Sequence, residues 1–187
     1  MLEFRILGPL EVVEQDRLLR LGGPKQRALL TALILSRGEV VSTDRLIDGL
    51  WGERAPASAV KAVQGYVSNL RRALGDGLLI TRGRGYALAV GPGQLDLDRF
   101  EALVVSGTGA LQAGDAGGAA RLLREALALW RGPPLADFAC EAFAQSEIMR
   151  LDEARLAAFE KRIDTDLANG QHAALIGELE ALVVTRG

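Results

Sequence analysis

The sequence is poor in the residues from which most enzyme and metal sites are built. Among 187 residues there is one cysteine, Cys140, and one histidine, His172. A single cysteine excludes an intrachain disulfide and fits a reducing cytosol, and one histidine with one cysteine is too few for a zinc site of the usual kind. No Gly-x-x-x-x-Gly-Lys-Ser/Thr segment occurs, and no nucleophile cluster accompanies His172. We expect neither enzymatic activity nor a cofactor or metal site.

The sequence also lacks a long apolar run. A membrane-spanning helix needs about 20 such residues, and residues 110–135, which are rich in alanine and leucine, are interrupted by charged side chains. The first residues alternate between polar and apolar in place of a charged-then-apolar leader, so no signal peptide is expected. These patterns predict a cytoplasmic protein with no membrane partner. The alanine- and phenylalanine-rich surroundings of Cys140 favour a buried structural thiol over a reactive one.

Charge is small in sum but unevenly divided. The formal net charge is −2, which argues against a polycation that coats nucleic acid. Residues 1–93 hold 13 Lys/Arg and 9 Asp/Glu, a net +4, whereas residues 94–187 hold 9 and 15, a net −6. The helix breaker Gly-Pro-Gly at 91–93 separates the two halves. We therefore expect two domains with different partners, 1–93 and 94–187.

Short periodic segments divide the first half into strands and helices. Alternation of apolar and polar residues indicates strands, proline tolerated at a first helical position indicates where a helix begins, and Ser42 or Thr43 suits a helix cap. The expected elements are strands at 2–6, 10–14 and 18–21, a helix over 24–36, a short strand at 40–41, helices over 44–51 and 57–74, and a hairpin of 78–81 with 86–90. This order predicts a winged helix preceded by an antiparallel sheet.

The helix over 57–74 has an apolar face and a polar face. Its expected core positions follow 3-4-3-4 spacing and are Val60, Val63, Val67, Leu70 and Leu74. The opposite face carries Ser58, Lys61, Gly65, Ser68, Asn69 and Arg72. Lys61 and Arg72 suit phosphates or guanine edges, Ser68 can reach a base edge, and the Asn69 amide suits adenine. Alternatively these charges form a solvated face, and Gly65 either allows a close approach of the backbone or is a tolerated surface glycine.

The hairpin that follows carries two arginines between glycines, Arg82 and Arg84. Such a tip suits a minor groove or a phosphate, with a solvent-exposed basic turn as the alternative. Lys25 and Arg27 lie near the start of the first helix, where they either hold a phosphate beside the helix N-terminus or are surface cations. A helix that enters a groove beside an arginine-tipped hairpin is typical of DNA binding.

The second half is expected to be helical throughout. Asp96 or Asp98 suits the cap of its first helix, further helices extend to Trp130 and over 141–168, and a last one covers about 172–184. Gly-containing turns at 114–115 and 169–170 connect successive helices, as in tetratricopeptide-like arrays. The fold class is therefore an α+β winged helix with an N-terminal sheet, followed by an all-α tetratricopeptide-like domain.

Several motifs, in order along the chain, resemble the Streptomyces antibiotic regulatory protein (SARP) family. They are Leu7-Gly-Pro-Leu10, Pro24-Lys-Gln-Arg-Ala-Leu-Leu30, Leu50-Trp-Gly52, Val67-Ser-Asn-Leu-Arg-Arg-Ala-Leu74 and Arg82-Gly-Arg-Gly-Tyr86. The later Leu129-Trp-Arg-Gly-Pro-Pro-Leu-Ala-Asp137 resembles the family's bacterial transcriptional activation domain. The resemblance implies an OmpR-type winged helix that activates transcription of antibiotic biosynthesis genes. It further implies that the protein binds direct repeats in promoter DNA, as a homodimer on DNA, and recruits RNA polymerase.

The resemblance also assigns roles to residues. It places DNA contacts on the third helix and the wing arginines, and a polymerase contact on the loop formed by Gly52, Glu53, Arg54, Ala55 and Pro56. Asn69 stands where many OmpR-type readers carry arginine, which argues against guanine readout there. The helical domain is shorter than the family's usual one, which suggests a truncated domain. The rival hypothesis is a helical-repeat interaction module whose winged helix no longer binds DNA.

Overall fold

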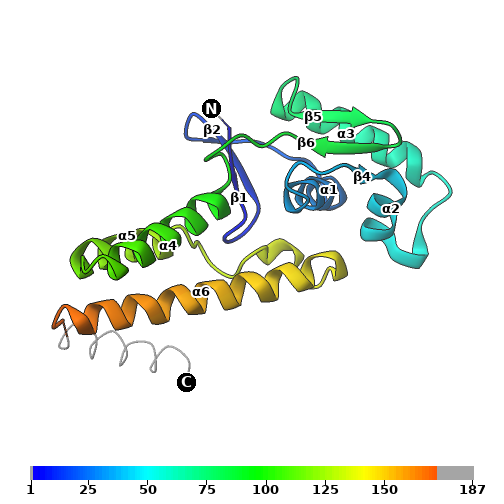
Figure 1. The fold of residues 1–187 in the computed structure, drawn as a ribbon. Coiled ribbons are helices and arrows are strands. Elements are labelled where there is room, and N and C mark those ends of the chain that lie inside the picture. Colours follow the sequence, from blue (N-terminus) through cyan, green and yellow to red (C-terminus); the bar gives the residue numbers. More distant parts are fainter. Residues whose placement is uncertain (1, 172–187) are drawn as a thin grey trace.

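The first half of the chain contains two small antiparallel sheets and three helices (Figure 1). The computed structural model describes residues 2–171. The first sheet has the order β1-β2-β3 and the second the order β4-β6-β5. The elements are β1 (Leu2–Arg5), β2 (Glu11–Glu14), β3 (Arg17–Leu18), α1 (Pro24–Leu35), β4 (Val41–Ser42), α2 (Thr43–Trp51), η1 (Gly52–Arg54), α3 (Ala59–Leu74), β5 (Leu79–Arg82) and β6 (Gly85–Leu88).

Local sequence signals explain where these elements begin and pair. Pro24 is the first residue of α1, and the Ser42 hydroxyl accepts a hydrogen bond from the Arg45 N–H at the start of α2. In the first sheet Phe4 pairs with Val12, and both are fully buried. The predicted winged helix with an N-terminal sheet is confirmed.

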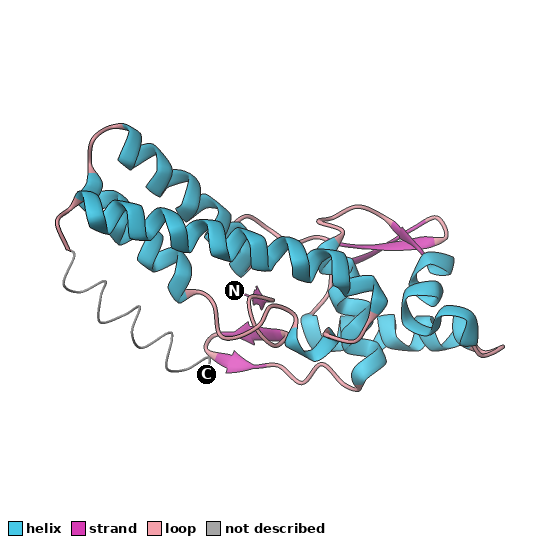
Figure 2. Cartoon of the chain, turned by 90° about the horizontal axis from the view of Figure 1, so that it is seen from below, coloured by secondary structure: helices cyan, strands magenta, loops and turns pink. Residues whose placement is uncertain are grey.

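The second half is a helical layer below the winged helix (Figures 1 and 2). Its elements are α4 (Asp96–Gln112), α5 (Ala116–Ala128), η2 (Ala136–Phe138) and α6 (Ala142–Ala168). The α4 and α5 helices pack so closely at Gly107 that a Cβ there would lie 3.0 Å from the Leu123 side chain. The Asp115 carboxylate caps α5 by accepting from the Gly118 N–H. The helix expected over 172–184 lies outside the described residues.

The two halves share backbone hydrogen bonds and one apolar core. The Phe4 N–H donates to the Gln94 carbonyl at 2.6 Å, and the carbonyls of Leu7 and Ile6 accept from the N–H groups of Arg131 and Leu135. Buried side chains of both halves, from Phe4 and Ile6 to Phe100 and Leu151, form one cluster. The domain limit expected at 91–93 falls in the turn before α4 and stays a prediction, because the core continues across it.

Asp96 forms the polar centre of the contact between the halves. We expected Asp96 or Asp98 to cap α4, but Leu95 occupies the cap position. Both oxygens of the Asp96 carboxylate accept from the Ile6 N–H at 2.9 Å, and one also accepts from the Leu7 N–H at 3.0 Å. Burial raises the pKa of this carboxyl, although those hydrogen bonds and the nearby Arg131 charge oppose the shift. The side chain thus satisfies the backbone N–H groups of two residues that directly follow β1.

Several ion pairs also join the two halves, and we call them, together with Asp96, the interdomain seam. Cations of the first half meet carboxylates of the second at Lys25–Glu141, Arg27–Asp137, Arg37–Asp98 and Arg37–Glu101. In the opposite direction, Arg99 and Arg131 of the second half meet Glu3 and Glu11 of the first. The acidic excess of the second half is therefore partly used to hold the basic first half.

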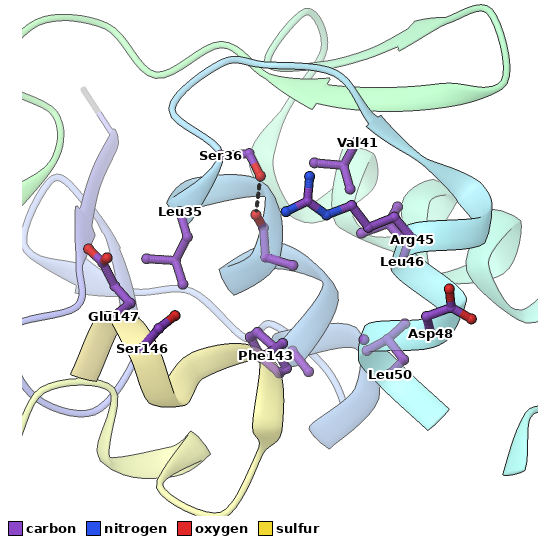
Figure 3. Close-up of a pocket in the computed structure, with 13 residues that line it drawn as sticks. Leu35, Ser36, Val41, Arg45, Leu46, Asp48, Leu50, Phe143, Ser146 and Glu147 are labelled. Atoms are coloured by element: carbon purple, nitrogen blue, oxygen red, sulfur yellow. Dashed lines mark hydrogen bonds between the residues drawn. The ribbon is translucent and has the colours of Figure 1, made fainter. Parts of the chain in front are cut away.

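The seam leaves a cleft of about 390 Å³ where α6 meets α1 and α2. Figure 3 shows apolar side chains such as Leu35 and Phe143 around it, with the charged Arg45, Asp48 and Glu147. In Figure 1, α1 lies between α6 and α3. The helical layer therefore covers α1 and α2 from the side away from α3 and the β5–β6 hairpin.

Two expectations about burial are wrong. Val60 was expected in the core, but 48% of it is exposed, because it lies in the first turn of α3, where the neighbouring Ala59 takes the buried position. Cys140 was expected to be a buried thiol but is exposed, because it lies in the loop between η2 and α6. The neighbouring Phe138 and Ala144 fill the apolar space that the composition suggested for it.

Candidate nucleic-acid interface

The outer face of α3 is free of packing. Val63, Val67, Leu70 and Leu74 hold the helix to the core as expected, which turns Lys61, Gly65, Ser68 and Arg72 toward solvent, where all four are exposed. Apart from the adjacent residues and the backbone of its own helix, nothing lies within 4 Å of the position that a Cβ on Gly65 would take. A ligand can therefore approach the α3 backbone at Gly65 without displacing any side chain.

The β5–β6 hairpin forms a wing whose tip is tied to α2. The backbone carbonyl of Arg84 accepts from both the N–H and the hydroxyl of Thr43, each at 2.9 Å. Gly83 has φ +56°, which favours glycine, and a Cβ on Gly85 would lie 2.5 Å from the Val41 carbonyl oxygen. The buried Tyr86 anchors the returning strand. The backbone at the wing tip is thus fixed, while the Arg82 and Arg84 side chains are exposed.

Arg71 connects α3 to the wing. Its Nε donates to the Leu79 carbonyl at 2.9 Å, and Nη2 donates to the Thr81 hydroxyl at 2.7 Å. Adjacent arginines therefore have different surroundings, because Arg71 is held by β5 whereas Arg72 faces solvent. The contact fixes the wing relative to the outer face of α3.

Four cations on this surface have no protein partner among the residues that the structure describes. Within residues 2–171, no salt bridge or side-chain hydrogen bond involves Lys61, Arg72, Arg82 or Arg84. We call these four residues, with the outer face of α3, the α3–wing face. Unpaired cations on a fixed backbone are available to phosphates without first breaking an ion pair.

Asn69 lies at the edge of the α3–wing face next to α1. Its Nδ2 donates to Oε1 of Gln26 at 3.2 Å, and Nε2 of Gln26 donates to the Leu21 carbonyl at 2.8 Å. Gln26 is buried, whereas Asn69 is exposed. The amide of Asn69 is therefore held on one side by a buried partner and open to solvent on the other.

Lys25 and Arg27 lie at the interdomain seam and not on the α3–wing face. Nζ of Lys25 donates to the Leu50 carbonyl. The Arg27 guanidinium donates to the Leu10 carbonyl at 2.9 Å and pairs with Asp137. Both cations have partners, so their role in phosphate binding stays a prediction that the geometry does not favour.

The loop expected to contact polymerase projects between α2 and α3. Gly52, Glu53, Arg54, Ala55 and Pro56 are all exposed. The ring centroids of Trp51 and Tyr66 lie 6.3 Å apart in a stacked arrangement, which fixes the start of the loop against α3. The loop thus has a defined base and a free surface close to the α3–wing face.

No sequence pattern assigned a contact to Gln26, Arg71 or Asp137, and Asp96 was expected only as a helix cap. Gln26, Arg71, Asp96 and Asp137 all act through contacts with distant segments, such as the Leu10 N–H that donates to Asp137 from 127 positions away. Periodicity reports which face of an element is buried but not which distant group a polar side chain meets.

Neither a metal site nor a membrane-spanning helix is found among the described residues. No group of three His, Cys, Asp or Glu side chains among residues 2–171 is placed to hold a metal ion. No helix in that range is long and apolar enough to cross a membrane.

Comparison with known proteins matches both halves to families of transcription regulators. Residues 14–88 match the family described as "Transcriptional regulatory protein, C terminal", and residues 95–186 match the "Bacterial transcriptional activator domain". A solved structure of Mycobacterium tuberculosis EmbR, in complex with a low-affinity phosphopeptide, superimposes with a TM-score of 0.93 at 36% identity. It covers 99% of this chain and 50% of that one.

Full-length relatives give the same result. The chain is 43% identical over 182 residues to the regulatory protein AfsR of Streptomyces coelicolor, which covers 97% of this chain and 18% of the relative. It is 40% identical to the transcriptional regulatory protein MoaR1 of Mycobacterium tuberculosis, over 97% of this chain and 60% of MoaR1. It is 36% identical to the regulatory protein DnrI of Streptomyces peucetius, over 97% of this chain and 71% of DnrI.

The fold and these matches define a winged-helix transcription regulator with a helical activator domain. The chain belongs to the SARP family of transcriptional activators, as its motifs indicated. It spans only 18% of the length of AfsR and 60% of MoaR1.

Proposed function

We propose that this protein binds promoter DNA sequence-specifically through the α3–wing face and activates transcription by recruiting RNA polymerase. The observation that carries the proposal is the set of four exposed, unpaired cations on a backbone fixed by Thr43 and Arg71. α3 presents a narrow polar face suited to a major groove, and the wing arginines suit the flanking minor groove or phosphates. Membership of the SARP family favours antibiotic or other secondary-metabolite genes as targets.

An electrophoretic mobility shift assay on promoter fragments tests the DNA-binding step. We expect Arg82→Ala/Arg84→Ala to lower the affinity by roughly tenfold or more at low salt, because two phosphate or groove contacts are lost. Arg121→Ala is the matched control, since Arg121 is also exposed but lies on α5 of the helical half. Absence of binding by the wild type to every promoter fragment would support the interaction module whose winged helix no longer binds DNA. Equal binding by the double variant and the wild type would contradict the role of the wing arginines.

The loop 52–56 is the proposed contact for polymerase. Glu53 and Arg54 are exposed and make no salt bridge among the residues described. We expect Glu53→Ala/Arg54→Ala to bind promoter DNA as the wild type does but to activate less in reconstituted transcription with RNA polymerase. Unchanged activation, or an equal loss of DNA binding, would contradict this role.

Binding to direct repeats implies two copies side by side. Footprinting with the full chain is expected to show two protected half-sites about one helical turn apart. A single protected half-site would overturn the proposed homodimer on DNA and leave the DNA-binding proposal in place.

A further inference from the structure

The side-chain amides of Gln26 and Asn69 form a short chain of hydrogen bonds, which we call the relay. Which group donates and which accepts is fixed at each step. Leu21 is buried, and its carbonyl accepts from Nε2 of Gln26 at 2.8 Å. If the Gln26 amide were reversed, its Oε1 would face that carbonyl oxygen, and two buried acceptors would be left without a donor. The Leu21 carbonyl therefore fixes which end of the Gln26 amide faces Asn69.

Packing holds Gln26 in the same orientation. Only 7% of the residue is exposed. Gly22 has φ +81°, and a Cβ at Gly22 would lie 2.8 Å from Nε2 of Gln26. The glycine thus allows the Gln26 amide to lie directly against the chain, where it has little room to turn.

The orientation of the Gln26 amide also fixes the orientation of the Asn69 amide. Since Oε1 of Gln26 accepts only, Asn69 must offer its Nδ2 to that oxygen, as the 3.2 Å contact shows. With one Nδ2 hydrogen committed to Gln26, the Asn69 amide is held in one orientation, in which Oδ1 and the second Nδ2 hydrogen remain for a ligand. A free asparagine amide can turn either end toward DNA, whereas this one is held with its acceptor available.

We propose that Gln26 is a positioning residue that makes Asn69 a reader of bases with an exocyclic amino group in the major groove. This inference rests on the proposed binding of DNA through α3. Adenine and cytosine present an amino donor there, at N6 and N4, whereas guanine and thymine present only acceptors at their hydrogen-bonding groups. An outward-facing Oδ1 of Asn69 accepts from the amino groups of adenine and cytosine, whereas the acceptor groups of guanine and thymine repel it.

Selection from a duplex DNA library with randomised positions, carried out with the full chain, tests whether Asn69 reads a base. We expect Asn69→Ala to lose the base preference at one position and to retain it at the others. In a second experiment, the adenine at that position is replaced by purine, or the cytosine by pyrimidin-2-one, because neither analogue has the amino group. The wild type is expected to bind these analogues about tenfold more weakly, and Asn69→Ala to bind them as well as the parent site.

The Gln26→Met variant tests the positioning role, because methionine has a similar length but no amide. We expect its preference at the same position to relax toward guanine and thymine, since the freed Asn69 amide can turn Nδ2 outward. Binding to non-specific duplex is expected to be unchanged. In the Asn69→Ala background, Gln26→Met is expected to have no effect on base preference, which a purely structural role would not predict.

Three results would overturn the inference. Wild-type binding that is insensitive to removal of the amino group would exclude the acceptor role, and this comparison holds even if Gln26→Met fails to fold. A Gln26→Met variant that loses affinity equally for all sequences, with its preference intact, would make Gln26 merely structural. If the wild type selects no sequence at all, the proposed function fails together with the inference, whereas the first two results leave that function standing.

Discussion

The interdomain seam and the α3–wing face are built from the same residue types but differ in how the cations are used. At the seam, Arg27 and Arg37 of the first half meet carboxylates of the second. On the α3–wing face, Arg72, Arg82 and Arg84 have no such partner among the described residues. The charge of a segment therefore does not show whether its cations serve folding or binding. The distinction depends on carboxylates that are remote in sequence.

The difference changes the meaning of the charge asymmetry between the halves. The acidic excess after residue 93 suggested a separate partner for the second half. Asp98, Glu101, Asp137 and Glu141 instead pair with cations of the first half. The pairing holds the helical domain on the side of the winged helix away from α3, and the cations that remain unpaired on the α3–wing face are available to DNA.

The largest loss of stability is expected when Asp96, at the centre of the seam, is replaced. Asp96→Ala leaves the N–H groups of Ile6 and Leu7 buried without an acceptor. We expect the free energy of unfolding to fall by about 3 kcal/mol, measured by urea denaturation. Asp98→Ala, on the exposed rim of the seam, is the control and is expected to cost less than about 1 kcal/mol. A similar loss in both variants would show that Asp96 has no special role.

A somewhat smaller effect is expected when the backbone of the wing is disturbed. In Gly85→Ala, the new Cβ meets the Val41 carbonyl oxygen at 2.5 Å, so β6 must move away from β4. We expect a loss of about 2 kcal/mol in stability and weaker DNA binding, because the contact of the Arg84 carbonyl with Thr43 is disturbed. Gly109→Ala, which meets open space in α4, is expected to be neutral or slightly stabilising. Unchanged stability and DNA affinity in Gly85→Ala would contradict a fixed wing.

The unpaired cations of α3 are expected to affect binding and not folding. Lys61→Ala/Arg72→Ala removes two predicted phosphate contacts, so the slope of log K against log salt is expected to become shallower by about 1.8, since each contact contributes about 0.9. Titrations at several salt concentrations measure this slope, and thermal unfolding checks that stability is unchanged. A slope equal to that of the wild type would show that these two residues do not contact phosphate.

Elements defined by local pattern were predictable, and contacts between distant segments were not. The 3-4 spacing of Val63, Val67, Leu70 and Leu74 placed the buried and outer faces of α3 correctly. The same rule failed at Val60, because spacing does not show where the core ends. The exposed positions of the α3–wing face followed from the pattern, whereas the relay through Gln26 required a contact between residues 43 positions apart. Whether the exposed residues bind DNA stays a prediction.

The smallest effect is expected at Arg27, where the two surfaces are most easily confused. From the sequence alone, a cation near the start of a helix suits a phosphate or is simply a surface cation. Arg27→Met retains much of the apolar stem but removes the pairing with Asp137 and the hydrogen bond to the Leu10 carbonyl. Because both charged side chains are partly exposed, we expect a loss of about 1 kcal/mol or less in stability and no change in the salt dependence of DNA binding. If Arg27 holds a phosphate instead, the salt slope becomes shallower by about 0.9 while stability is retained. That result would assign Arg27 to the DNA-binding surface and not to the interdomain seam.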